Sequence, residues 1–180
     1  MKHVLAVLIL CLSFHAFAQD QKKDEKPATL KSVLLDQLKT THTEKDWFVT
    51  ANIAVEGLTA EQASWTDGHG NHSIGQLAYH MVFWNRQVLA KFKGETPDKF
   101  SGNNDETFNS FDTKKWNETV RDLDKVMVDI EKFVEAADDK TIEKIAPTVA
   151  RIGTHNAYHT RQIVYIRRLQ GSWNPEKGVK

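Results

Sequence analysis

Residues 73–93 read SIGQLAYHMVFWNRQVLAKFK, and this stretch decides the fold class. Its apolar side chains recur at spacings of three and four, which is the pattern of one face of an α-helix. Ser73 is a favoured N-cap residue, and Gly94 directly after the stretch is a common stop. The pattern therefore predicts a helix over 73–93 with an apolar face of Ile74, Leu77, Met81, Trp84, Val88 and Phe92.

Three further segments show helical spacing, and no stretch shows sustained strand-like alternation. The first is predicted over residues 29–56, with an apolar stripe of Leu30, Val33, Leu34, Leu38 and Phe48. The third follows Asp112 and carries Trp116, Val120, Leu123, Met127, Ile130 and Val134. The fourth is predicted to begin near Pro147, since proline suits a first turn, and to end at Gly171. Four helices with one apolar side each bury those sides best against one another, which predicts an all-α four-helix bundle.

The connection between the second and third predicted helices is unusually long. It covers residues 94–111, whereas an antiparallel pair of neighbouring helices needs only a tight turn. A link of this length can cross the bundle and leave the two helices parallel. We therefore expect up-down-down-up order, with a long crossover between helices two and three.

The N-terminal residues 1–18 have the features of a cleaved secretory signal peptide. A basic start, Met1-Lys2-His3, precedes an apolar run that ends at Ala16-Phe17-Ala18, a small-x-small cleavage site. The apolar run is shorter than the roughly 20 residues of a membrane span. The lone Cys11 lies inside it and follows Leu10, which does not suit a lipoprotein cut. We expect an exported protein, periplasmic or extracellular, with no membrane association after cleavage.

The rest of the chain divides into three parts. Residues 19–28 are polar and charged and are predicted to form a flexible tether. Residues 29–171 form the bundle, and residues 172–180 form a C-terminal tail interrupted by Pro175. The 24 basic and 24 acidic residues balance, so the sequence gives no electrostatic case for nucleic acid. A small-molecule substrate or ligand is the expected partner, and a homodimer stays open.

The placement of three histidines suggests a metal site. His155 and His159 are four residues apart on the apolar side of the fourth predicted helix, so both rings can reach one ion. His80 flanks the apolar face of the second helix at a similar depth. Three imidazoles and a vacant position are typical of an open metal site, and imidazole suits zinc or nickel. The alternative is that the histidines are hydrogen-bonded residues of a purely structural core.

Two motifs resemble those of a known family. The segment 72–81, HSIGQLAYHM, has the form S-I-G-x-L-x-x-H, and the segment 154–163, THNAYHTRQI, has the form H-x-x-x-H-x-x-Q. Together they resemble the DinB-like family, which includes the YfiT-type metal proteins. The resemblance implies an up-down-down-up bundle with a divalent metal held by His80, His155 and His159. It also implies activities such as thiol-dependent S-transfer or isomerisation, since some members have them.

The sequence leaves two functions open for this site, a metal-dependent enzyme and a non-catalytic binding protein. An enzyme would be a metal-dependent hydrolase or a thiol-transferase-type protein, because a metal ion can activate water or a thiol. No HExxH glutamate supplies a general base, so the catalytic residues are unassigned. The other function is a non-catalytic bundle that binds a small ligand or a metal. The candidates for the rim of a pocket are Trp65, Asp67, His69, His72 and His42.

Overall fold

The computed structural model describes residues 27–178, and all the regular structure in that range is helical. The predicted signal peptide and most of the predicted tether lie outside the described residues. The α-helices are α1 Leu30–His42, α2 Ala51–Val55, α3 Ala60–Ser64, α4 Ile74–Lys93, α5 Glu106–Asn109, α6 Trp116–Ala136 and α7 Asp139–Leu169. Two short 3-10 turns, η1 Thr113–Lys115 and η2 Pro175–Lys177, complete the described elements.

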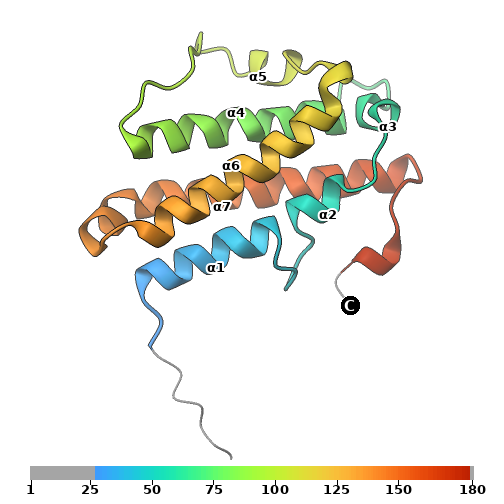
Figure 1. Ribbon diagram of the computed structural model, residues 1–180. Coiled ribbons are helices and arrows are strands. Elements are labelled where there is room, and N and C mark those ends of the chain that lie inside the picture. The colour runs from blue at the N-terminus through green and yellow to red at the C-terminus, as the bar shows by residue number, and fades with distance from the viewer. Residues whose placement is uncertain (1–26, 179–180) are drawn as a thin grey trace, which may run out of the picture.

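The four long helices, α1, α4, α6 and α7, form the predicted bundle (Figure 1). Helices α4 and α6 run in one direction, and α1 and α7 run in the other. Helix α4 packs against α6 and α7, and α1 packs against the same two helices on the opposite side of the bundle. The expected all-α bundle with up-down-down-up order is therefore confirmed.

Helix α4 begins and ends where the sequence predicts. The Ser73 side chain accepts a hydrogen bond from the Gln76 amide, and the Gln76 side chain accepts one from the Ser73 amide. This reciprocal capping box satisfies two amides that would otherwise lack partners at the helix start. At the other end Gly94 adopts a left-handed conformation with φ of 72°, which favours glycine. Local side-chain chemistry thus fixes both ends of this helix.

The first predicted helix, over residues 29–56, is wrong in its second half. Helix α1 ends at His42, residues 43–50 are not helical, and Thr50 caps a separate helix, α2. The Thr50 side chain accepts from the Ile53 amide and so favours a new helix start over continuation of the old one. The predicted stripe is also too wide, because Leu30 and Val33 are 49% and 54% exposed.

The fourth predicted helix begins earlier than expected. Asp138 caps α7 by accepting a hydrogen bond from the Thr141 amide, and Pro147 lies inside the helix. An interior proline removes one backbone hydrogen bond and costs about 3 kcal/mol. The added first turns bury Ile142 and Ile145, which contribute about 1.5–3 kcal/mol each and offset that cost.

The long crossover packs onto the bundle and carries its own short helix. Figure 1 shows α5 beside α4, on the face away from α1. Phe111 lies directly over Gly75 of α4, where a β-carbon would overlap its ring. A glycine in the first turn of α4 therefore permits the close approach of the crossover, which places Thr107 and Phe108 beside His80 of α4.

The C-terminal residues fold back against the bundle. Arg167 of α7 is 5% exposed and donates hydrogen bonds to the carbonyl oxygens of Ala54 and Ser172. Lys177 pairs with Glu56. These contacts hold α2 and the segment after α7 together. None of the helices within residues 27–178 combines the length and apolarity needed to cross a membrane.

Candidate metal centre

His80 of α4 and His155 and His159 of α7 meet inside the bundle. The Nε2 atom of His155 lies 3.1 Å from Nε2 of His80 and 3.1 Å from Nε2 of His159. His80 and His159 are buried, at 2% and 6% exposure. The structure thus brings together the three histidines that the sequence singles out, and each offers one ring nitrogen to a common point.

A buried pair of asparagines fixes the register of the two helices that carry the histidines. The Asn85 side-chain amide of α4 donates to Asn156 Oδ1 of α7 at 2.8 Å, and the Asn156 amide donates back to Asn85 Oδ1 at 3.1 Å. Both side chains are fully buried. Because breaking this pair would leave buried amides without partners, α4 and α7 cannot slide without a cost. The pair lies one residue from His155 and about one turn from His80.

The orientation of the His80 ring follows from its partner on α5. His80 Nδ1 lies 2.6 Å from Thr107 Oγ1, and the Thr107 hydroxyl donates its only proton to the Asn104 carbonyl at 2.6 Å. The hydroxyl oxygen must therefore accept a hydrogen bond from Nδ1–H of His80. The lone pair of His80 is then on Nε2, the atom that faces the other two histidines.

The His159 ring is held in the same way from its own helix. Its Nδ1 lies 2.6 Å from Gln162 Oε1, and the Gln162 amide donates to the Tyr158 hydroxyl at 3.3 Å. A carbonyl oxygen only accepts, so Nδ1 of His159 donates and its Nε2 carries the lone pair. His155 differs, because its Nδ1 is buried and has no hydrogen-bond partner among the described residues.

The surroundings keep the three rings uncharged. Burial, followed by the effect of His159 and His155, lowers the pKa of His80 to about 3. Burial, followed by the effect of His155, lowers the pKa of His159 to about 4. Burial also lowers the pKa of His155. At neutral pH the site therefore presents neutral imidazoles, the form that binds metal ions.

The geometry fits a metal ion. Zinc binds imidazole nitrogens at about 2.0–2.1 Å, and a tetrahedral arrangement then places neighbouring nitrogens about 3.3 Å apart. The two Nε2 separations of 3.1 Å are close to that value. The Nε2 lone pairs of His80 and His159 converge on one point, which is unfavourable unless a cation or proton satisfies them. The chemistry of the donor set thus allows a divalent metal.

An aromatic stack supports His80 from the crossover side. The Phe108 ring lies 3.9 Å from the His80 ring, and the His72 ring lies 3.8 Å from the other side of Phe108, all nearly parallel. His72 therefore touches the site only through Phe108. His72 is not one of the three histidines whose ring nitrogens come together.

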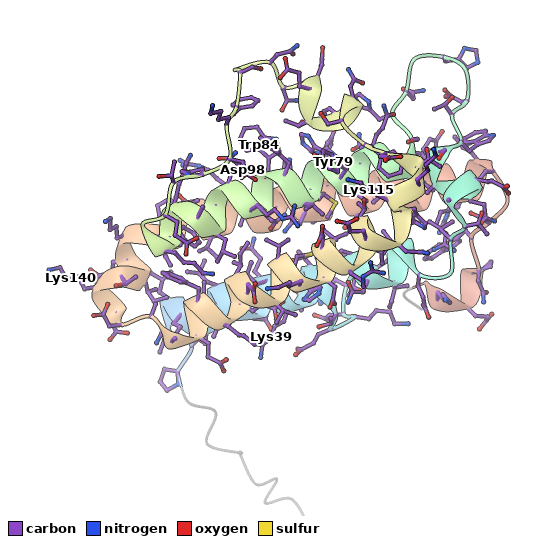
Figure 2. The ribbon with its side chains drawn as sticks, turned by 45° about the horizontal axis from the view of Figure 1, so that its top comes forward. Lys39, Tyr79, Trp84, Asp98, Lys115 and Lys140 are labelled. Atoms are coloured by element: carbon purple, nitrogen blue, oxygen red, sulfur yellow. The ribbon has the colours of Figure 1, made fainter. Side chains whose placement is uncertain are left out.

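The three histidines line a cavity of about 550 Å³. Its apolar walls come from Trp84 and Val88 of α4, Phe108 of α5 and Ile152 of α7. Figure 2 shows Trp84 on the side of α4 that faces the crossover, where its ring packs against Phe100. The polar lining comes from Asn104, Thr148, Arg151 and Tyr158. The histidines are therefore accessible from a largely apolar cavity of small-molecule size.

Three of the predicted rim residues line a different cavity. Trp65, Asp67 and His72 border a neighbouring space of about 420 Å³ that also contacts Gln162. His69 is exposed on the same loop, where its backbone amide donates to Asp67 Oδ1 at 3.0 Å. This second cavity thus lies behind His159, on the other side of the residue that orients its ring.

His42 lies on the other side of the bundle. It is 1% exposed, and its two ring nitrogens lie 2.7 Å from Glu131 Oε1 and 3.1 Å from Asp124 Oδ1 of α6. Asn52 also donates to Asp124 Oδ1 at 2.7 Å. Burial alone would lower the pKa of His42, but Glu131 and then Asp124 outweigh it and raise the pKa. Its partners are carboxylates of the protein itself.

Sequence reasoning missed the residues that orient and enclose the site. Gln162 follows His159 by three positions, a spacing that permits a hydrogen bond on one helix. Arg151 precedes His155 by four positions and could have been found by the same spacing rule. Thr107 and Phe108 lie in the long crossover, and no periodic signal in the sequence connects them to His80.

The protein is an all-α bundle in which two neighbouring helices bring three histidines close enough together to hold a metal ion. The family model described as the DinB superfamily matches residues 42–163, which is most of the bundle. The chain belongs to the DinB superfamily, so the resemblance seen in the two sequence motifs is confirmed. No curated protein and no solved structure gave a significant match to the chain.

Proposed function

We propose that this protein binds one divalent metal ion through the Nε2 atoms of His80, His155 and His159 and acts as a metal-dependent enzyme. The observation that carries the proposal is the convergence of these atoms with two of the rings oriented by hydrogen bonds behind them. Metal-binding histidines characteristically donate their second ring N–H to an oxygen in this manner. Thr107 and Gln162 supply those oxygens. Imidazole ligands favour zinc or nickel.

The reaction class we propose is hydrolysis or thiol transfer. A divalent ion at a three-imidazole site retains an open position and, when bound, lowers the pKa of a coordinated water or thiol. The chain's own residues supply the rest. Trp84 and Phe108 exclude water from one side of the cavity, and the Asn85–Asn156 pair keeps the ligands in register. Tyr158 places a hydroxyl beside the histidines.

A second function is favoured by one specific observation. Within residues 27–178 no aspartate or glutamate lines the cavity, so none of these residues places a carboxylate there to act as a general base. A non-catalytic protein that holds a metal or a small ligand needs no such base. Turnover measurements decide between the two functions.

We also propose that the protein acts after export, in the periplasm or outside the cell. The support is the sequence of residues 1–18, whose basic start, apolar run and small-residue cleavage site suit a signal peptide. N-terminal sequencing of protein recovered from the periplasm or medium tests this, and a protein that begins at Met1 in the cytoplasm would contradict it.

The metal proposal is tested by the metal content of the purified protein, measured by mass spectrometry. We expect one equivalent in the parent and none in His80→Ala, His155→Ala or His159→Ala. The matched control is His69→Ala, which removes an exposed histidine from the neighbouring loop and should retain the metal. Circular dichroism confirms that each variant is folded. A parent without stoichiometric metal overturns the proposal, and metal retained in all three variants overturns the ligand assignment.

Activity is tested on the metal-loaded protein with ester, amide, phosphate and thiol substrates. Turnover that disappears in His159→Ala supports the enzyme. Bound metal without turnover of any class supports the binding protein.

A further inference from the structure

Arg151 places a cation beside the histidine cluster. It lies on α7 four residues before His155, so the two side chains occupy the same face of the helix one turn apart. Its side chain is exposed and lines the 550 Å³ cavity. Among the described residues no acidic group pairs with it, whereas Arg86 on α4 is paired with Asp122. The guanidinium is therefore available to a molecule that enters the cavity.

None of the described residues that line the cavity carries a negative charge. They are the three histidines, apolar and aromatic side chains, neutral polar groups and Arg151. A divalent ion on the three imidazoles would add a second positive centre to the cavity that Arg151 lines. Such a cavity favours an anion over a neutral molecule of the same shape.

The apolar walls of the cavity indicate the size and character of the uncharged part of the ligand. Trp84, Val88, Phe108 and Ile152 surround the space between Arg151 and the histidines with apolar surface. The volume lies within the range of sites for small molecules, roughly 300–1,000 Å³. A ligand that fits would have an apolar body of aryl or short alkyl size and an anionic end.

We propose that this cavity binds a small carboxylate with an apolar body, and that Arg151 determines the preference for the charged end. The guanidinium donates paired hydrogen bonds to the carboxylate, a geometry that suits arginine better than lysine. The apolar body lies between Trp84 and Ile152, and the far end of the ligand faces the histidines. The inference rests on the proposed function for the metal, and it names the substrate class of the same site.

The test uses 4-phenylbutyrate as the probe and isothermal titration calorimetry on the metal-loaded protein. The neutral analogue 4-phenylbutanol has the same apolar body without the charge. We expect the wild type to bind the carboxylate at least about tenfold more tightly than the alcohol, since tenfold corresponds to one charge-assisted hydrogen bond. Equal affinity for the two probes, or no binding of the carboxylate, overturns the inference.

Substitutions on α7 assign the preference to one residue. Arg151→Gln should weaken carboxylate binding at least about tenfold and leave the alcohol unchanged, and Arg151→Lys should restore part of the loss. The matched control is Arg161→Gln, which removes an exposed arginine of the same helix that lines a different cavity. Unchanged carboxylate affinity in Arg151→Gln overturns the inference.

Two measurements separate a failure of this inference from a failure of the metal proposal. Metal content is determined in each variant, and Arg151→Gln should retain the wild-type amount. The titrations are then repeated after metal removal. If the parent holds no metal, the metal proposal fails, yet a carboxylate preference that depends on Arg151 in the metal-free protein still supports the inference. Full metal content without any charge preference overturns the inference alone.

Discussion

The bundle contains two buried histidine sites that differ in what surrounds them. The cluster between α4 and α7 places His80, His155 and His159 against one another, and the part of the chain that the structure describes contributes no acidic group to the cavity they line. The site between α1 and α6 places His42 between Glu131 and Asp124. The pKa is lowered for all three histidines of the cluster and raised for His42.

This difference separates a cluster whose nitrogens are placed to bind a cation from a site whose partners all come from the chain itself. In the cluster the imidazoles are neutral, and the Nε2 lone pairs of His80 and His159 both face Nε2 of His155, which has at most one proton to donate. His42 has a carboxylate on each ring nitrogen, so its hydrogen-bonding groups are all satisfied. Burial of a histidine therefore does not by itself indicate a metal ligand, because the two buried sites differ in the charge of the groups around them.

The largest expected effect is the loss of metal-dependent stability in the cluster. A ligand present at a thousand times its Kd stabilises the folded state by about 4 kcal/mol. For a domain of this size that is a rise in Tm of about 8–16 °C. We expect a chelator to lower the Tm of the wild type by such an amount and to have no effect on His80→Ala. A chelator effect that persists in His80→Ala, measured by calorimetry, would contradict the comparison.

The second-largest effect is expected at His42. His42→Ala should lower the free energy of unfolding by about 2–4 kcal/mol, because it leaves Glu131, only 16% exposed, without its partner. Urea unfolding measures this. The double variant His42→Ala with Glu131→Ala should be less destabilised than the sum of the single variants, because the second change removes the stranded charge. If the losses of unfolding free energy were additive, the pair would make no specific contribution to stability. All three variants should keep the wild-type metal content.

A smaller effect is expected behind the cluster. Thr107→Val keeps the shape of the side chain but removes the oxygen that accepts from His80 Nδ1–H. Loss of such a partner typically weakens metal binding about 10–100-fold. Competition with a chromophoric chelator gives the affinity. The control Thr154→Val removes a hydroxyl from α7 that only donates to the Ala150 carbonyl, and it should bind metal as the wild type does.

The smallest effect is the pH dependence of stability, which should have opposite signs at the two sites. The raised pKa of His42 stabilises the folded state fully below about pH 6.5, and this contribution is lost as pH rises through the folded-state pKa. The lowered pKa values of the cluster act in the other direction. In metal-free protein the unfolded chain takes up protons first, so stability falls as pH falls from about 6.5 toward 4.

Chemical denaturation across this pH range compares the wild type with two variants. The stability difference from His42→Gln should shrink as pH rises above about 6.5. His159→Gln should lose part of the acid-side decline. The same slope in both variants would remove the distinction between the sites.

The helices differed in how well the sequence predicted them. Helix α4 was predicted with its ends because its caps, Ser73 and Gly94, lie in the sequence beside an unbroken apolar stripe. The break after His42 and the start of α7 at Asp138 were missed. After His42, the side-chain cap of the next helix outweighed the continuous helical periodicity that predicted one long helix. At the start of α7, the Asp138 cap and the burial of apolar residues in the added turns outweighed Pro147, which predicted a later start.

The sequence by itself determined the fold class and the three histidines as candidates, since helical periodicity and i, i+4 spacing are properties of neighbouring residues. The family followed from the resemblance of two short motifs, residues 72–81 and 154–163. Only the tertiary structure decided which nitrogens converge, since that depends on the register of α4 and α7 and on the Asn85–Asn156 pair. It also placed Thr107 and Phe108 of the crossover behind His80 and left Arg151 at the cavity. Contacts between residues far apart in the chain have no periodic signal, so packing of the whole bundle is what creates the site.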